Sequence, residues 1–288
     1  GPEPDVGQAC AGRVRRPAAA GLYAGASRTA SGEPVKIPAF VPRDLRELLR
    51  FVPTRGWDAL EWRPLLSTLR SLSLRYATNQ GVPELRRACA AAAPGVRFVH
   101  LVPRSRRLEA LADPAARRRA GDELLRLYFA QWRVEEGLFV DLRPVHLGLG
   151  TDGTLEFAPN GLWVRLRPEF RAGMVDLYRS FYRDDAEAFR AALRRMGLSS
   201  PDLAPEAEAA LEEKLRAHFG LDQTAQRFSI DRFPASFYDR FAFFVDHGYR
   251  LHSDFVFVGF CLITLYLALE AGGQEHDVRT ICREVLDP

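Results

Sequence analysis

The chain has 288 residues, 47% of them hydrophobic and 27% charged, a balance typical of a folded globular protein and not of a disordered one. Its 40 basic and 37 acidic side chains leave a formal charge of only +3, which argues against nucleic acid as the main partner. The four cysteines are scattered without metal-ligand spacing, and the opening GPEPDVGQ shows no signal-peptide pattern. We therefore expect a cytoplasmic protein without structural zinc or a disulfide framework.

The first 40 residues consist of short β-like pieces separated by turn residues. Within them VGQACAGRV (6–14) fits the small-residue loop G-x-A-x-x-G-x-V. Such a loop lets backbone N–H groups approach the phosphate oxygens of a nucleotide. The candidate nucleotide-binding positions are Gly7, Ala9, Gly12 and Val14. A flexible terminus rich in alanine and glycine would explain the stretch equally well.

A lysine in the strand-like piece PVKI (34–37) is the second candidate for nucleotide binding. Only Lys36 and Lys214 are lysines among the 40 basic residues, so the identity of this side chain is informative. A strand lysine that faces a nucleotide neutralises α- and β-phosphate oxygens. The alternative is a surface lysine on an edge strand.

From Pro42 the apolar residues stand three and four apart, which predicts helices. These segments are RDLRELLRFV (43–52), WRPLLSTLRSLSLRYA (62–77) and VPELRRACAAAA (82–93). Two strand-like pieces, 96–102 and 106–112, precede a break at Asp113–Pro114. We expect this break to separate a small mixed lobe, residues 1–113, from a larger helical lobe, residues 114–288.

The second half begins with a predicted helix over 120–137, for which Gly137 would be the C-cap. Short strands are expected around the turn Thr151-Asp152-Gly153, and helices from Pro168 onward. The apolar run FVFVGFCLITLYLAL (255–269) has 15 residues and predicts a buried core helix, not a transmembrane segment. The nearby aromatic residues have the spacing of a core helix, with an interaction surface as the alternative. They are Phe233, Phe237, Tyr238, Phe241, Phe243 and Phe244.

The stretch FVDLRPVHLGLGTDGTLEFAPNG (139–161) has the layout of a kinase catalytic loop, a β-hairpin and a metal-binding loop. Asp141 stands where the catalytic aspartate would lie beside the accepting hydroxyl. His146 replaces the asparagine that would bind magnesium, and Pro159-Asn160-Gly161 replaces Asp-Phe-Gly. An imidazole is a poor ligand for Mg²⁺ and a proline side chain is none, so we expect no metal site of the usual kind.

Three substitute metal ligands deserve consideration. Glu156 precedes the Pro-Asn-Gly loop in a strand, and Asp152 lies at the hairpin tip, where Asp-Gly is ordinary turn chemistry. His146 would suit a softer metal than magnesium, although a lone histidine is more often a packed or capping residue. ATP therefore remains a candidate ligand, whereas we expect Mg²⁺ to be held poorly.

Taken in order, these pieces resemble the UbiB/AarF-like atypical kinases, which carry an alanine-rich loop over the nucleotide. The resemblance covers nearly the whole chain and is clearest in RLRPEFRAGMVDLYRSFYRDDAEAFRAALRRMGL (165–198) and RFPASFYDRFAFFVDHGYRLHSDF (232–255). It implies an α+β, bilobal protein-kinase-like fold. It also implies a loop at Gly7–Val14, a strand lysine at Lys36 and a catalytic aspartate at Asp141.

The departures from this family concern its polar catalytic set. No acid is present near Ser71-Leu72-Ser73, and the glutamate that should pair with Lys36 falls near Ala77. The family's lysine-glycine-glutamine motif does not occur in these 288 residues. The hydrophobic scaffold is thus kept while the catalytic residues are largely lost, as in a pseudokinase.

Three hypotheses about function follow. The first is a pseudokinase that senses a nucleotide or serves as a scaffold or accessory protein, with a protein or lipid-like partner in isoprenoid or quinone metabolism, as the resemblance implies. The second is a divergent ATPase or small-molecule kinase that uses Lys36 and Asp141. The third is a cleft reused for a ligand other than a nucleotide.

Overall fold

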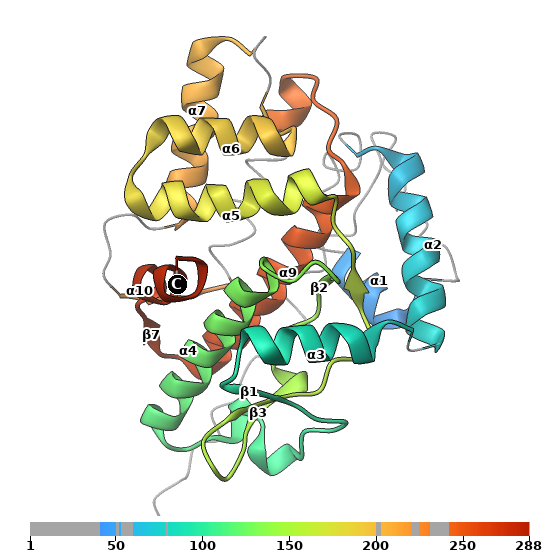
Figure 1. The fold of residues 1–288 in the computed structure, drawn as a ribbon, viewed down its shortest axis with the longest axis vertical. Helices are drawn as coiled ribbons and strands as arrows, with labels where there is room; N and C mark the ends of the chain where they lie inside the picture. The colour runs from blue at the N-terminus through green and yellow to red at the C-terminus, as the bar shows by residue number, and fades with distance from the viewer. Residues whose placement is uncertain are drawn as a thin grey trace, which may run out of the picture.

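The computed structural model describes residues 41–49, 52, 60–78, 80–199, 203–219, 225–230 and 242–287. Within these residues the chain is an α+β protein in which helices predominate over short strands, as expected (Figure 1). The loop positions Gly7, Ala9, Gly12 and Val14 and the strand residue Lys36 lie outside the described residues. The two-lobed, kinase-like arrangement remains a prediction.

Three helices open the described part of the chain: α1 (Arg43–Leu49), α2 (Trp62–Thr78) and α3 (Val82–Ala92). They correspond to the three helical segments expected there. Gly81 precedes α3 with a φ of 77°, a left-handed conformation that glycine adopts without a steric penalty. The side chain of Trp163 lies against this glycine, and its Nε1 donates to the Gln80 carbonyl.

The sheet that follows joins segments from both sides of Asp113. Strand β1 (Val96–Phe98) pairs in parallel with β4 (Leu155–Phe157), which pairs antiparallel with β3 (Leu147–Leu149). The β3–β4 hairpin confirms the predicted turn, in which Gly153 has a φ of 84° and Gly150 N–H donates to the Thr154 carbonyl.

The predicted strand over 106–112 is wrong. The chain there forms two 3₁₀ turns, Arg104–Arg106 and Leu108–Ala110. Only Leu108 is buried within them, while Arg106 and Arg107 are half-buried and Glu109 and Ala110 are exposed. A single backbone bridge, between Arg107 and Gly148, and an ion pair between Arg106 and Glu156 of β4 connect this segment to the sheet.

Helix α4 (Pro114–Gln131) begins and ends earlier than predicted. Asp113 is its N-cap and accepts hydrogen bonds from the N–H groups of Ala115 and Ala116, while Pro114 occupies the first turn, where no N–H is needed. Gly137 is not its C-cap, since the helix ends six residues before it. Instead, Gly137 lies against Trp163 of the antiparallel pair β2 (Leu138–Phe139) and β5 (Trp163–Val164).

The remaining helices form the upper and central parts of the molecule (Figure 1). Helices α5 (Pro168–Arg183) and α6 (Ala186–Met196) form a hairpin, with Asp185 as the N-cap of α6 and Gly197 as its left-handed C-cap. Helix α7 (Pro205–Phe219) crosses behind α6 in the view of Figure 1 and packs on it, and α10 (Val278–Leu286) packs on α5 and α4. A two-residue pair, β6 (Gln226–Arg227) with β7 (Glu275–His276), precedes α10.

Helix α9 (Ser253–Gly272) runs through the centre of the molecule and contacts α4 and α2. By length and composition it could cross a membrane, and in the part of the chain that the structure describes no other helix could. Yet 72% of its most apolar window is buried inside the protein, which agrees with the predicted core helix. Phe243 and Phe244 are also buried, whereas the other four aromatic residues singled out with them lie outside the described residues.

Candidate functional site

The loop that carries Asp141 is held between two buried helices. The side chain of Gln131, at the end of α4, accepts the Phe139 N–H at 2.7 Å. On the other side Thr264 of α9 donates to the Val140 carbonyl at 3.1 Å, and its Oγ1 accepts the Leu142 N–H at 3.0 Å. These bonds satisfy the backbone groups of a short buried segment that lacks regular neighbours, so the position of Asp141 is fixed by side chains of α4 and α9.

The Asp141 carboxylate is 1% exposed and both of its oxygens are occupied. Arg143 binds it in a bidentate manner, with Nε 2.8 Å from Oδ1 and Nη2 2.7 Å from Oδ2. Asn160 Nδ2 donates to Oδ2 at 2.6 Å. The Arg143 backbone N–H adds a bond to Oδ1 at 3.2 Å. Both carboxylate oxygens thus accept hydrogen bonds from groups of the protein itself.

The Arg143 guanidinium also reaches helix α1. Its Nη1 lies 2.9 Å from Oε2 of Glu47, and its Nη2 lies 3.1 Å from Oδ1 of Asp44. Asp44 in turn accepts a hydrogen bond from the Tyr76 hydroxyl of α2 at 3.2 Å. The residues Asp44, Glu47, Tyr76, Asp141, Arg143 and Asn160 form a network that we call the Arg143 cluster, and it joins α1, α2 and two loops.

Both charges at the centre of the cluster are stabilised. Burial alone would raise the pKa of Asp141, but the His146 imidazole and the Arg143 guanidinium together hold that pKa well below its usual range. Burial alone would lower the pKa of Arg143, but Asp141 and Asp44 raise it above its ordinary value. Asp141 is therefore a permanently ionised, internally paired carboxylate at neutral pH.

His146, the residue in place of the magnesium-binding asparagine, lies beside this pair. It closes the 3₁₀ turn Pro144–His146, and its carbonyl accepts the Ala158 N–H at 2.9 Å. Its Nε2 is 3.3 Å from Oδ2 of Asp141 but does not have hydrogen-bond geometry. The hairpin thus brings His146 and Asn160 to Asp141. In the described part of the chain no three acidic, histidine or cysteine side chains gather as a metal site would need.

The two acids considered as substitute metal ligands are bound to arginines. Glu156 is 3% exposed, and its Oε1 lies 3.0 Å from Arg106 Nη1 and 3.2 Å from Arg97 Nη2. Asp152 is at the hairpin tip and pairs with Arg97 at 3.0 Å. Their positive partners would have to leave before a cation could bind.

Sequence reasoning identified Asp141, His146 and the Asn160 loop but missed the partners that close the site. Asp44 and Glu47 read as ordinary charges of an amphipathic helix, and nothing local connects them with Arg143, which is 96 residues away from Glu47. Thr264 lies within the apolar run 255–269, where nothing in the sequence indicates a polar role. The one available signal was Arg143 itself, a basic side chain next to the proposed catalytic acid.

Comparison with models of known protein families and with curated protein sequences gives no match for this chain. The geometry of the Arg143 cluster is accordingly the main basis for assigning a function.

Proposed function

We propose that this chain is a pseudokinase: a kinase-like, two-lobed protein that does not transfer phosphate and acts as a nucleotide-sensing, scaffolding or accessory protein. The observation that carries the proposal is the state of Asp141, which is buried and paired on both oxygens. A catalytic aspartate must accept or position the proton of a substrate hydroxyl within hydrogen-bond reach. An acid with a strongly lowered pKa and no accessible oxygen serves that purpose poorly.

Among the residues that the structure describes there is no metal ligand set, which supports the same proposal. Phosphoryl transfer relies on metal ions that neutralise the developing charge, a contribution of several kcal/mol. At the position of the usual metal carboxylate this chain has Pro159, and the next residue, Asn160, directs its Nδ2 donor at Asp141. Arg143, at the position where the catalytic-loop pattern has a basic residue, supplies the positive charge beside Asp141.

The Arg143 cluster would then have a structural purpose. It ties α1 and α2 to the loops that follow β2 and β4, so it fixes how these four segments lie against each other. A protein that works through its surface benefits from such a fixed arrangement. The partner we propose is a protein or a lipid-like molecule of isoprenoid or quinone metabolism, as the resemblance to UbiB/AarF-like proteins implies.

The experiment that tests this proposal is nucleotide binding and turnover in parallel. Thermal unfolding is recorded with ATP alone, with Mg²⁺ and with Mn²⁺, and phosphate release is followed on the same samples. A ligand at one hundred times its dissociation constant should stabilise the fold by about 2.7 kcal/mol, which is easily observed. We expect stabilisation by ATP that does not depend on the metal, and no phosphate release above the protein-free rate.

A matched pair of lysine variants makes the result specific. Lys36→Met should remove the stabilisation by ATP, whereas Lys214→Met, at the only other lysine, should keep it. Metal-dependent turnover that both Lys36→Met and Asp141→Asn abolish would instead establish the divergent ATPase or small-molecule kinase. If ATP has no effect at all, nucleotide sensing is excluded, and a scaffold or a cleft reused for another ligand remains.

A further inference from the structure

Helix α2 exposes large apolar side chains to solvent. Its inner side packs on α9 and β5, and Figure 1 shows the helix along one edge of the molecule, with no labelled element on its outer side. Among the described residues five large hydrophobic side chains are exposed, and three of these five belong to this one helix. They are Trp62, Leu66 and Leu74, with exposed fractions of 39%, 41% and 63%. Exposed apolar side chains that gather in one place mark an interaction surface.

The exposed leucines lie in one row with a positive charge between them. Leu66, Arg70 and Leu74 follow each other at intervals of four residues, a spacing that places side chains in a row along a helix. Arg63 lies one turn before Leu66, and Trp62 stands four residues before it, so both belong to the same side of α2. Arg63 and Arg70 are exposed as well. We call these five residues the α2 face.

The positive charge of the α2 face is not neutralised by its surroundings. Helix α2 contains three arginines and no acidic residue. Neither Arg63 nor Arg70 pairs with a carboxylate of the residues that the structure describes. The third arginine, Arg75, is half-buried and stacks on the Trp163 ring, 4.3 Å from its centroid. The α2 face thus presents two free guanidinium groups next to apolar side chains.

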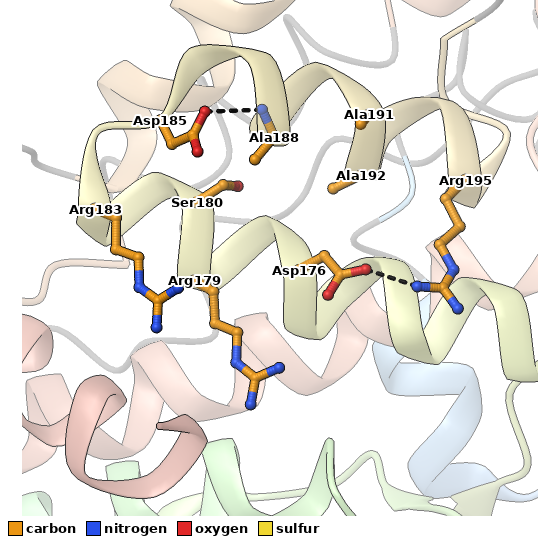
Figure 2. A pocket seen from close by; sticks show the side chains of 9 residues that line it. All are labelled: Asp176, Arg179, Ser180, Arg183, Asp185, Ala188, Ala191, Ala192 and Arg195. Carbon is orange, nitrogen blue, oxygen red and sulfur yellow. Dashed lines mark hydrogen bonds and ion pairs between the residues drawn. The ribbon is translucent and has the colours of Figure 1, made fainter. Parts of the chain in front are cut away.

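The arginines beside the groove between α5 and α6 show the opposite case. Arg195 pairs with Asp176 at 2.7 Å across the two helices (Figure 2). Arg179 and Arg183 extend away from α6 and share the carboxylate of Asp287, each at 2.8 Å. These charges are matched inside the protein, whereas those of the α2 face remain available to an external anion.

We propose that the α2 face docks this protein on an anionic lipid surface. Leucine and tryptophan insert at the boundary between headgroups and acyl chains, where tryptophan is enriched. Arginine stems lie along apolar groups while their guanidinium heads reach the lipid phosphates. The α2 face supplies both parts of this recognition on one helix at the edge of the molecule.

A lipid surface fits the α2 face better than a protein partner does. The anchor residues of protein interfaces fill well-packed, fully desolvated pockets. A protein partner would have to place a pocket over each leucine and a carboxylate over each arginine, whereas a fluid anionic bilayer meets both needs without matched positions. The proposal goes beyond the pseudokinase function and holds whether or not ATP binds.

The test is sedimentation with lipid vesicles of two compositions. One is an equimolar mixture of phosphatidylcholine and phosphatidylglycerol, which is anionic, and the other is phosphatidylcholine alone. An arginine near an anionic surface contributes about fivefold to binding, so the unchanged chain should bind the neutral vesicles about 30-fold more weakly. Arg63→Gln/Arg70→Gln should lose the same factor on anionic vesicles. Leu66→Ala/Leu74→Ala should lose at least about tenfold, since one inserted methylene from each leucine is already worth about fourfold.

Two controls make the result specific to this helix. Arg118→Gln/Arg119→Gln removes the same charge from an exposed arginine pair on α4 and should leave vesicle binding unchanged. Brominated lipids should quench the tryptophan fluorescence of the unchanged chain, and Trp62→Phe should reduce that quenching, since Trp132 and Trp163 are buried.

Thermal unfolding separates this proposal from the proposed function. It confirms that each variant is folded; if the leucine variant is not, the arginine variant carries the test. The response to ATP should be the same in the unchanged chain and in Arg63→Gln/Arg70→Gln, because the α2 face takes no part in nucleotide binding.

Several results would overturn the proposal. One is the absence of binding to anionic vesicles, or equal binding to both compositions. Another is an equal loss in Arg118→Gln/Arg119→Gln, which would mean that net charge alone attracts the lipid. Full binding by the leucine variant, or quenching that Trp62→Phe leaves unchanged, would show that the helix does not insert. If the vesicles do not bind but polyglutamate does, and the arginine variant abolishes that binding, the α2 face recognises an acidic protein instead.

Discussion

Replacing Arg143 by methionine should destabilise the protein strongly, because it leaves the Asp141 carboxylate buried without its cation. Arg143 makes a bidentate pair with Asp141 and further pairs with Asp44 and Glu47. Methionine fills much of the same volume without a charge. The Arg143→Met variant therefore isolates the electrostatic part of the interaction.

The size of the loss in unfolding free energy depends on whether Asp141 stays ionised or becomes protonated in the variant. An unpaired buried charge costs about 3–5 kcal/mol. The carboxyl can escape that cost by binding a proton, and at pH 7 protonating a group with an unfolded pKa near 3.9 costs about 1.4 kcal/mol per pH unit, or roughly 4 kcal/mol. The two routes give similar values, so we expect Arg143→Met to lose about 4 kcal/mol of unfolding free energy at pH 7.

This reasoning also fixes the pH dependence of the variant. If Asp141 is protonated in the folded variant, its folded pKa lies above the unfolded value, and stability must rise as the pH falls. The penalty relative to the unchanged chain should shrink by about 1.4 kcal/mol per pH unit between pH 7 and pH 5. The double variant Asp141→Asn/Arg143→Met removes the buried charge and should recover most of the loss.

Urea unfolding followed by circular dichroism at pH 7, 6 and 5 measures these free energies. Arg43→Met is the matched control, since Arg43 pairs with Glu47 on the exposed surface of α1, and such pairs contribute about 0–1 kcal/mol. A loss below about 1 kcal/mol for Arg143→Met at pH 7 would refute the reasoning. So would a penalty that does not change between pH 7 and pH 5.

Three further predictions concern acid stability, packing and thiol chemistry. In the unchanged chain the pKa of Asp141 is lowered by folding, so the ionised Asp141 contributes its full stabilisation above the unfolded pKa of about 3.9 and loses it as the pH falls further. The unfolding free energy of the unchanged chain should therefore fall more steeply below about pH 4 than that of Asp141→Asn. Equal slopes in acid titrations of the two proteins would contradict the pairing. Gly148→Ala would place a Cβ 2.5 Å from the Arg106 carbonyl oxygen and should lower the free energy of urea unfolding by about 1–3 kcal/mol. In Gly153→Ala the new Cβ meets no atom within 4 Å, so only the left-handed φ should cost stability, about 1 kcal/mol. A larger loss for Gly153→Ala than for Gly148→Ala would refute the packing argument. Burial raises the pKa of the Cys89 thiol to about 12, and it also raises the pKa values of Cys261 and Cys282. A thiol reagent at pH 8 should therefore modify at most one of the four cysteines in the native protein, and all four only after unfolding. The protected thiols are Cys89, Cys261 and Cys282.

The sequence by itself determined those local structures that depend only on residues close together in the chain. The hairpin turn at Asp152-Gly153 follows from one residue pair, because glycine adopts a positive φ at little cost. The helix pair α5 and α6 and the core helix α9 follow from apolar spacing and from composition. The prediction failed for residues 106–112. Their alternation of apolar and polar residues suits a strand, but in the structure the chain there forms 3₁₀ turns.

Only the tertiary structure decided the state of Asp141. Its position in a kinase-like motif indicated a catalytic acid, and the only sequence signal to the contrary was the basic residue Arg143, two positions further along the chain. The partners that close the site come from α1, and Thr264, which holds the loop, comes from α9. Whether a carboxylate is accessible and reactive depends on its burial and on the charges beside it, and here these are set by segments about a hundred residues away in the chain.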